Sequence, residues 1–373
     1  RTFILLNHTA MKPSLFIGIL VGLVAFNFVA TVPIKIQEDV QASKGFWTWS
    51  CVLNATYTYN NTVEQICKGV MKTSSTGSIV VAVDLTSATL PVIGGYAVDQ
   101  TSQLGYILMT SDPYDIDNTN FQTSIIVANV NTGAIQSTTP VSSSFYNFKS
   151  DQILATSFDS SSKNLYLLIQ TNVQYPSMSN FKIVSISVTT GQFTIKLNSP
   201  LQSSNAFIYV SSALDATHGI YYVVMGSGSQ GGWELYELNF QSNSVVMIPA
   251  PYGFVSIAYN PSSNGLTGTL FNAIGTANLM TYSPLTSSFT LFSNTSYVTN
   301  TTQWKYCGAS SPLGALDQSI STYATMCCSD ADGCSQGGVI QTVSLLNGQA
   351  LSDSSTINWV NEIQFGLYWI TSN

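Results

Sequence analysis

Short runs of Val, Ile, Tyr, Phe and Thr, separated by Gly, Ser, Asn and Asp, follow one another along the chain from residue 78 onward. Helical spacing of apolar positions is almost absent there, so the pattern predicts many short β-strands. The runs also recur in a fixed order. Each unit starts with a strand that ends in a small residue, an apolar residue and then Asp or Asn. These endings are Asp99, Asp159, Asp215, Asn260 and Asp317.

Each of these strands is followed by a polar turn and two further apolar strands, and a shorter fourth strand closes the unit. In the first complete unit the second and third strands are expected at residues 105–110 and 123–130. Repeats of four strands, with loop insertions, are typical of a β-propeller. The recurring Asp or Asn has a local explanation, because its side chain accepts hydrogen bonds from backbone amides two residues further on.

The two ends of the repeat region predict how the ring closes. Residues 78–93 supply only a third and a fourth strand, and residues 357–373 supply only a first and a second. Joined, they complete a sixth unit, and pairing of the N- and C-terminal strands leaves no free sheet edge. The favoured fold is therefore an all-β propeller of six blades over residues 78–373. Seven blades is the alternative, if residues 46–59 form strands of their own.

Residues 31–77 stand outside this repeat. They hold Trp47, Trp49, two cysteines and a short segment at 62–72 that we expect to be helical. The segment is predicted to be an N-terminal, glycosylated appendage that packs on the ring or reaches a neighbouring molecule.

The repeat resembles the generic "LY-x-V-D-x-x-T-G" repeat of secreted six- or seven-bladed propellers. The segments that carry the resemblance are Ile79–Asp84 and Lys182–Gly191. It covers residues 78–373 and implies the fold only. The Trp-Asp endings of WD40 units and the double glycines of kelch units are missing, so no activity and no site residue is carried over.

The N-terminal stretch predicts export. Lys12, directly after Met11, precedes an uncharged apolar run over residues 14–30, which is the pattern of a secretory signal peptide. We expect residues 1–30 to be upstream residues plus a signal peptide, with cleavage near Ala30. The protein would then be secreted or displayed at the extracellular surface, without a stable membrane span. An uncleaved signal anchor is the alternative.

Cysteines and glycosylation sequons agree with that compartment. The chain has six cysteines, an even number that predicts three disulfides in an oxidising environment. Sequence proximity favours pairing Cys51 with Cys67, and local pairing among the other four. The absence of a Cys-x-x-Cys pair argues against zinc. The six are Cys51, Cys67, Cys307, Cys327, Cys328 and Cys334. N-glycosylation is predicted at Asn54, Asn60, Asn294 and Asn300.

Charge excludes one large class of functions. Only 8% of the residues are charged, the net charge is −7, and Arg1 is the only arginine. Nucleic-acid binding needs a basic surface, and this chain has none. Few charges also mean little electrostatic repulsion between copies.

Catalytic and cofactor motifs are scarce. His218 falls in a turn between two strands and is expected to be solvated, and no Gly-x-Ser-x-Gly elbow is present. The single cofactor candidate is calcium, for which alternating carboxylates are suitable ligands. The leading site is Asp112, Asp115 and Asp117, and a second is Asp330 with Asp332. A solvated polar loop is the alternative for both.

These observations predict a non-enzymatic extracellular protein with a structural or adhesive role, as a self-assembling subunit of a coat, matrix or filament. Its partners would be further copies of itself or other extracellular glycoproteins and glycans. Two alternatives remain: a recognition module for carbohydrate or protein, and a metal-dependent hydrolase or lyase. Fold alone does not choose among them.

Overall fold

The computed structural model describes most of the chain between residues 45 and 370. Outside the description lie residues 1–44, 60–61, 75–78, 86–91, 100, 111–121, 148–149, 173–179, 201–206, 228–231, 272–276, 293–305, 308–313, 318–321, 329–337, 347–349, 354–362 and 371–373. Apart from one short 3-10 helix, η1 (Ser143–Phe145), every described element is a β-strand. The predicted all-β class is confirmed.

Five antiparallel sheets are each built from consecutive strands, and we call them blades 1 to 5. Blade 1 consists of β4 (Val92–Asp99), β5 (Leu104–Thr110), β6 (Thr123–Asn129) and β7 (Ile135–Val141). Blade 2 consists of β8 (Gln152–Asp159), β9 (Asn164–Gln170), β10 (Asn180–Ser187) and β11 (Phe193–Pro200). Blade 3 consists of β12 (Phe207–Asp215), β13 (Ile220–Ser227), β14 (Trp233–Asn239) and β15 (Ser244–Ala250). Blade 4 consists of β16 (Phe254–Asn260), β17 (Gly265–Phe271), β18 (Ala277–Ser283) and β19 (Ser288–Leu291).

Blade 5 differs in its inner edge. Two short strands, β20 (Tyr306–Cys307) and β21 (Gly314–Asp317), pair with the same strand, β22 (Thr322–Cys328). The blade continues outward through β23 (Gly338–Ser344) and β24 (Ala350–Asp353).

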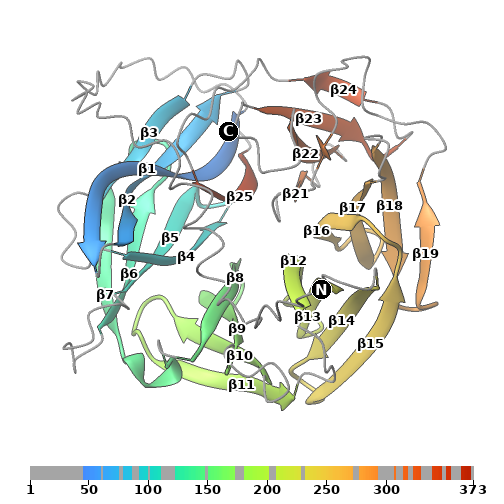
Figure 1. Ribbon diagram of the computed structural model, residues 1–373, viewed down its shortest axis with the longest axis horizontal. Coiled ribbons are helices and arrows are strands. Elements are labelled where there is room, and N and C mark those ends of the chain that lie inside the picture. Colours follow the sequence, from blue (N-terminus) through green and yellow to red (C-terminus); the bar gives the residue numbers. More distant parts are fainter. Residues whose placement is uncertain are drawn as a thin grey trace, which may run out of the picture.

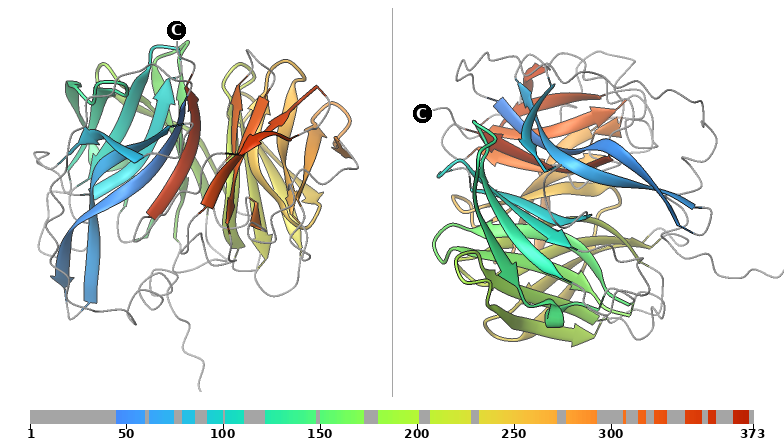
Figure 2. Two further views of the ribbon diagram at one scale, coloured as in Figure 1. Left: turned by 90° about the horizontal axis from the view of Figure 1, so that it is seen from above. Right: turned by 90° about the vertical axis from the view of Figure 1, so that its left-hand side faces the viewer.

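The blades stand around a common axis (Figure 1). The first strand of each blade lies toward the centre and the last lies at the outside (Figure 1). The inner strands β4, β8, β12, β16 and β21 contact one another in that order. From the side, the strands run between the two faces of the ring (Figure 2). This radial arrangement is that of a β-propeller, which confirms the predicted fold class. The blade number differs from the prediction, because the described residues form five such blades, whereas six were favoured and seven were the alternative.

A sixth sheet of different construction lies between blade 5 and blade 1, and we call it the closing sheet. Its order is β25 (Ile363–Ile370), β1 (Gly45–Tyr59), β2 (Thr62–Ser74) and β3 (Ile79–Asp84). β25 contacts both β21 and β4. The C-terminal stretch therefore contributes one described strand and the N-terminal stretch three, whereas the sequence suggested two from each end.

The predicted appendage over residues 31–77 is wrong for its described part. β1 and β2 form a long hairpin inside the closing sheet, with Gly45 opposite both Ser74 and Ile370. The segment expected to be helical is strand β2, because pairing with β1 and β3 outweighs its local preference. Residues 46–59 add a strand to this sheet, and the described residues form no seventh sheet.

The hydrophobic core lies between neighbouring sheets. Side chains of a strand alternate between its two faces, and in β9 both faces are covered. Leu165 and Leu167 pack in the cluster shared with blade 1, and Tyr166 and Leu168 pack in the cluster shared with blade 3. Because both faces are covered, the middle strands have continuous apolar runs in the sequence. Such runs are otherwise typical of parallel sheets, which are also buried on both faces.

Candidate functional site

The recurring Asp and Asn residues close the turns between first and second strands, as predicted. Asp99 Oδ1 accepts a hydrogen bond from the Thr101 amide at 3.1 Å, and Asp159 Oδ1 accepts one from the Ser161 amide at 3.0 Å. Burial alone would raise the pKa of Asp159, but hydrogen bonds from Ser162 and Ser161 bring it below its usual value. These carboxylates hold turns.

His218 occupies a special place in this motif. Ser102 Oγ and Ser162 Oγ each donate to the second carboxylate oxygen of their turn aspartate at 2.6 Å. In blade 3 the residue at that position is His218, whose Nδ1 lies 2.7 Å from Asp215 Oδ2. The imidazole thus replaces a turn serine. Its side chain is 54% exposed, which confirms the expected solvated turn residue.

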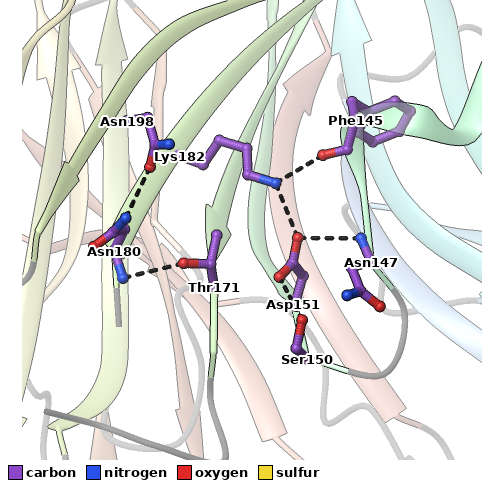
Figure 3. A network of polar contacts seen from close by, with 8 residues as sticks. All are labelled: Phe145, Asn147, Ser150, Asp151, Thr171, Asn180, Lys182 and Asn198. Carbon is purple, nitrogen blue, oxygen red and sulfur yellow. Dashed lines mark hydrogen bonds and ion pairs between the residues drawn. The ribbon is translucent and has the colours of Figure 1, made fainter. Parts of the chain in front are cut away.

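A polar network lies where the chain crosses from blade 1 to blade 2 (Figure 3). Lys182 Nζ on β10 donates to Asp151 Oδ2 at 2.9 Å and to the carbonyl oxygen of Phe145 at 2.8 Å. The same carboxylate oxygen accepts the Asn147 amide at 3.1 Å, and Ser150 Oγ donates to Oδ1 at 3.1 Å.

Both charges of this network are withdrawn from water. The Asp151 side chain is 4% exposed and the Lys182 side chain is 13% exposed. Two buried charges are tolerable only where each is paired and its remaining donors or acceptors are satisfied. The pair therefore fixes the crossing segment around η1 to a middle strand of the next blade. A structural clamp is the role that this geometry supports.

A second network joins blades 3 and 4. Tyr282 on β18 donates to Glu237 Oε1 on β14 at 2.7 Å. Burial raises the pKa of Glu237, and the hydrogen bond from Tyr282 lowers it only in part. Tyr222 and Tyr259 stack nearby with ring centroids 6.3 Å apart. Burial, followed by the hydrogen bond to Asp215, raises the pKa of Tyr259. Tyr282 and Tyr259 stay neutral and hydrogen-bond to carboxylates of blade 3, so they tie the two sheets together.

A third network lies near the axis between blades 4 and 5. Tyr323 is buried and donates to the carbonyl oxygen of Ser256 at 2.6 Å, with Thr269 Oγ1 at 3.2 Å. Ser256 sits where the register of β16 against β17 shifts, and its φ is 53°. Left-handed backbone in a non-glycine residue persists only where the surroundings hold it. The hydroxyl of Tyr323 supplies that restraint.

The sequence did not reveal these interblade networks. Lys182, one of only 11 basic residues in the chain, lies between Phe181 and Ile183 in a strand with no other charged residue. That is a signal for a buried partner, but the partner comes from a connection 31 residues away. Similarly, Glu237 and Tyr282 are 45 residues apart and meet only through the packing of two blades.

The predicted sites fall largely outside the described residues. This applies to the calcium candidates Asp112, Asp115, Asp117, Asp330 and Asp332, to glycosylation sites Asn60, Asn294 and Asn300, to Cys334 and to the signal region 1–30. Asn54 lies within β1. Within the described part of the chain, no three His, Cys, Asp or Glu residues are grouped to hold a metal ion. Nor does any helix there have the length and apolarity to cross a membrane.

The other five cysteines lie on paired strands. Cys51 is on β1 and Cys67 on β2, where Leu53 is opposite Cys67. Cys307 is opposite Cys327 across β20 and β22, and Cys327 is disulfide-bonded. Cys328 follows in the same strand. The identity of the disulfide pairs, including Cys51 with Cys67, stays a prediction.

Neither a family model nor a curated protein matches the chain. Among solved structures, it is similar to a chain of a nidogen/laminin complex at 10% identity and a TM-score of 0.47, covering 89% of this chain and all of the other. It is also similar to TolB from Acinetobacter baumannii at 10% identity and a TM-score of 0.47, covering 87% of this chain and 66% of TolB. The periplasmic gluconolactonase PpgL from Pseudomonas aeruginosa matches at 9% identity and a TM-score of 0.45, covering 88% and 99%.

These likenesses correct one prediction. Low charge and missing motifs led to the expectation that the protein is not an enzyme, yet its structural neighbours include that gluconolactonase and a puromycin-hydrolyzing peptidase from Mycobacterium tuberculosis. The fold is therefore compatible with catalysis, and the inference against it fails. At 10% identity or less, the neighbours assign neither activity to this chain. The order of the strands and the radial arrangement of the sheets establish that the chain has the β-propeller fold.

Proposed function

We propose that this chain is a secreted, N-glycosylated and disulfide-bonded protein with a structural or adhesive role outside the cell. It would act as a self-assembling subunit of a coat, matrix or filament. The observation that carries the proposal is the character of the outer strands, which form the rim of the ring.

Four of the outer strands, β7, β11, β15 and β19, are nearly free of charge and partly apolar. Large exposed aliphatic side chains occur on four outer strands: Ile135 on β7, Ile195 on β11, Val246 on β15 and Leu291 on β19, each more than 40% exposed. Lys196 is the one charged residue in these four strands.

Each outer strand pairs with one neighbour only, so its other edge is unpaired within the described residues. Soluble proteins usually protect such edges with lysine, other charges, bulges or proline, because a bare edge pairs with other chains. Prolines stand near the ends of three of them, at Pro140, Pro200 and Pro249. A register shift interrupts the pairing of β7 and of β11, whereas β15 and β19 pair without one and have the least protected edges. A rim of this kind favours association between molecules.

We further propose that the closing sheet serves as a sixth blade and clasps the ring. Contacts of β25 with β21 and with β4 support this role. Removing residues 363–373 should then lower the free energy of unfolding and make the ring sensitive to proteolysis. A truncated protein as stable as the full chain would contradict the clasp.

The function is tested on protein purified from the medium of an expressing eukaryotic cell, without refolding. We expect electron microscopy and analytical ultracentrifugation to show oligomers or filaments that grow with protein concentration. Treatment with a glycosidase should lower the mass by the weight of several glycans. Particles that stay monomeric at every concentration would overturn the proposed assembly, and protein retained inside the cell would overturn secretion.

A further inference from the structure

Among the described outer strands, β15 differs from its equivalents. Val246 and Met247 are neighbours in the sequence and are 48% and 40% exposed. Because successive side chains point to opposite faces of a strand, apolar groups flank the free edge on both sides. In contrast, β7 exposes one large aliphatic residue, Ile135, and β11 carries a lysine directly after Ile195.

A rigid aromatic pair lies directly after this strand. Pro251 to Phe254 form a tight turn closed by a 3.1 Å hydrogen bond from the Phe254 amide to the Pro251 carbonyl. Gly253 has a φ of 86°, which the third position of this turn requires. Tyr252 is held at the tip and is 60% exposed, and its ring meets Trp233 edge-on at 5.5 Å. Trp233 in turn packs against the core between blades 3 and 4.

Exposed Tyr and Met side chains supported by a partly buried Trp are typical of the centre of protein interfaces. Their side chains offer a large contact area while losing little conformational freedom. Residues 244–254 contain no charged residue. We call the surface formed by β15, Trp233 and Tyr252 the β15 edge.

We propose that the β15 edge is a self-association surface at which two copies of this chain pair their β15 strands antiparallel across a twofold axis. This inference rests on the proposed function and names the surface that performs it. The chain has few charges and β15 has none, so two copies meet there with little electrostatic repulsion. The nearest carboxylates, Glu234 and Glu237, lie on β14 opposite Pro249 and Val246.

The geometry of the edge is self-complementary. An antiparallel pair of identical strands has twofold symmetry, so each residue contacts its counterpart on the other strand in the reciprocal manner. Five residues, Ser244–Ile248, precede Pro249, which lacks the N–H that a ladder needs. Five residues extend over about 17 Å, a usual strand length. Tyr252 would then add an aromatic contact at each end of the paired strands.

The test places like charges opposite each other. Val246→Lys and Val246→Glu should each raise the dissociation constant for self-association at least tenfold. Sedimentation velocity of the purified variants should therefore show a larger share of monomers than for the wild type. Mixed in equal amounts, the two variants should associate again, because the lysine of one copy faces the glutamate of the other. Ile135→Lys on β7 is the matched control and should associate like the wild type. Circular dichroism and the melting temperature verify that all variants are folded.

The outcomes separate this inference from the proposed function. If the wild type associates and Val246→Lys associates equally well, or if Ile135→Lys is as damaging as Val246→Lys, the β15 edge is not the surface while self-association stands. Failure of the Lys and Glu variants to associate on mixing would overturn the pairing of two copies through β15. A wild type that is monomeric at all concentrations would overturn both proposals.

Discussion

Replacing Lys182 with methionine tests whether the buried ion pair clamps the crossing between blades 1 and 2. Methionine keeps most of the apolar stem and removes the ammonium. The Asp151 carboxylate, 4% exposed, would keep the Asn147 amide and the Ser150 hydroxyl but lose its only positive partner within the described residues. The Phe145 carbonyl would lose its Lys182 donor as well.

Breaking a buried pair by removing one partner costs about 3–5 kcal/mol, because the remaining charge stays buried without compensation. Lys182 is 13% exposed, so water reaches the site in part, and we expect a value near the lower limit. Asp151→Asn should be destabilising for the same reason, because it leaves the Lys182 ammonium buried without a negatively charged partner. The loss of unfolding free energy in the double variant should be smaller than the sum of the two single losses by about 0.5–3 kcal/mol, as is found for residues in direct contact.

Equilibrium unfolding in urea, followed by tryptophan fluorescence, measures these differences if the transition is two-state. Lys196→Met is the matched control, because Lys196 lies on the outer strand of the same blade and makes no ion pair among the described residues. The control should remain within about 0.5 kcal/mol of the wild type. A Lys182→Met variant that loses less than about 1 kcal/mol, or strict additivity in the double variant, would refute the clamp.

Three further results are expected. His218→Ser should have a free energy of unfolding within about 0.5 kcal/mol of the wild type, because a serine makes the same turn contact in blades 1 and 2. His218→Ala should lose about 1 kcal/mol more, and equal losses of the two variants in thermal melts would contradict this. Glu237 has a raised pKa when folded, so its ionisation opposes folding as the pH rises through that pKa. Glu237→Gln should therefore gain stability relative to the wild type between pH 4 and pH 8, and a constant difference in urea midpoints would argue against the shift. Tyr323→Phe should cost about 1–3 kcal/mol, because the buried Ser256 carbonyl loses its donor, and a neutral result in the same assay would exclude that role.

Local signals were sufficient for the repeating strands. The second strand expected at residues 105–110 is β5, Leu104–Thr110, and the third expected at 123–130 is β6, Thr123–Asn129. Apolar runs ended by turn residues identify such strands, because both faces are buried and the turns need particular side chains. The Asp and Asn turns could be predicted for the same reason, since their partners lie two or three residues away.

The closing sheet could not be assigned correctly from these signals. Residues 62–72 have an apolar spacing that fits a helix as well as a strand, and only their partners β1 and β3 select the strand. Local signals do not identify β1 and β3 as partners of this segment, so the sequence predicts it outside the ring.

The strands, their order within each repeat and the turns between them can be predicted from the amino-acid sequence, because they depend on residues close together in the chain. The assignment of strands to the closing sheet, and the pairs of charged and hydroxyl groups that meet between blades, follow from the packing of the folded ring. Lys182 with Asp151 and Glu237 with Tyr282 are brought together by the packing of neighbouring sheets. The energy of such pairs depends on burial and distance, and neither quantity is encoded in any local stretch of the chain.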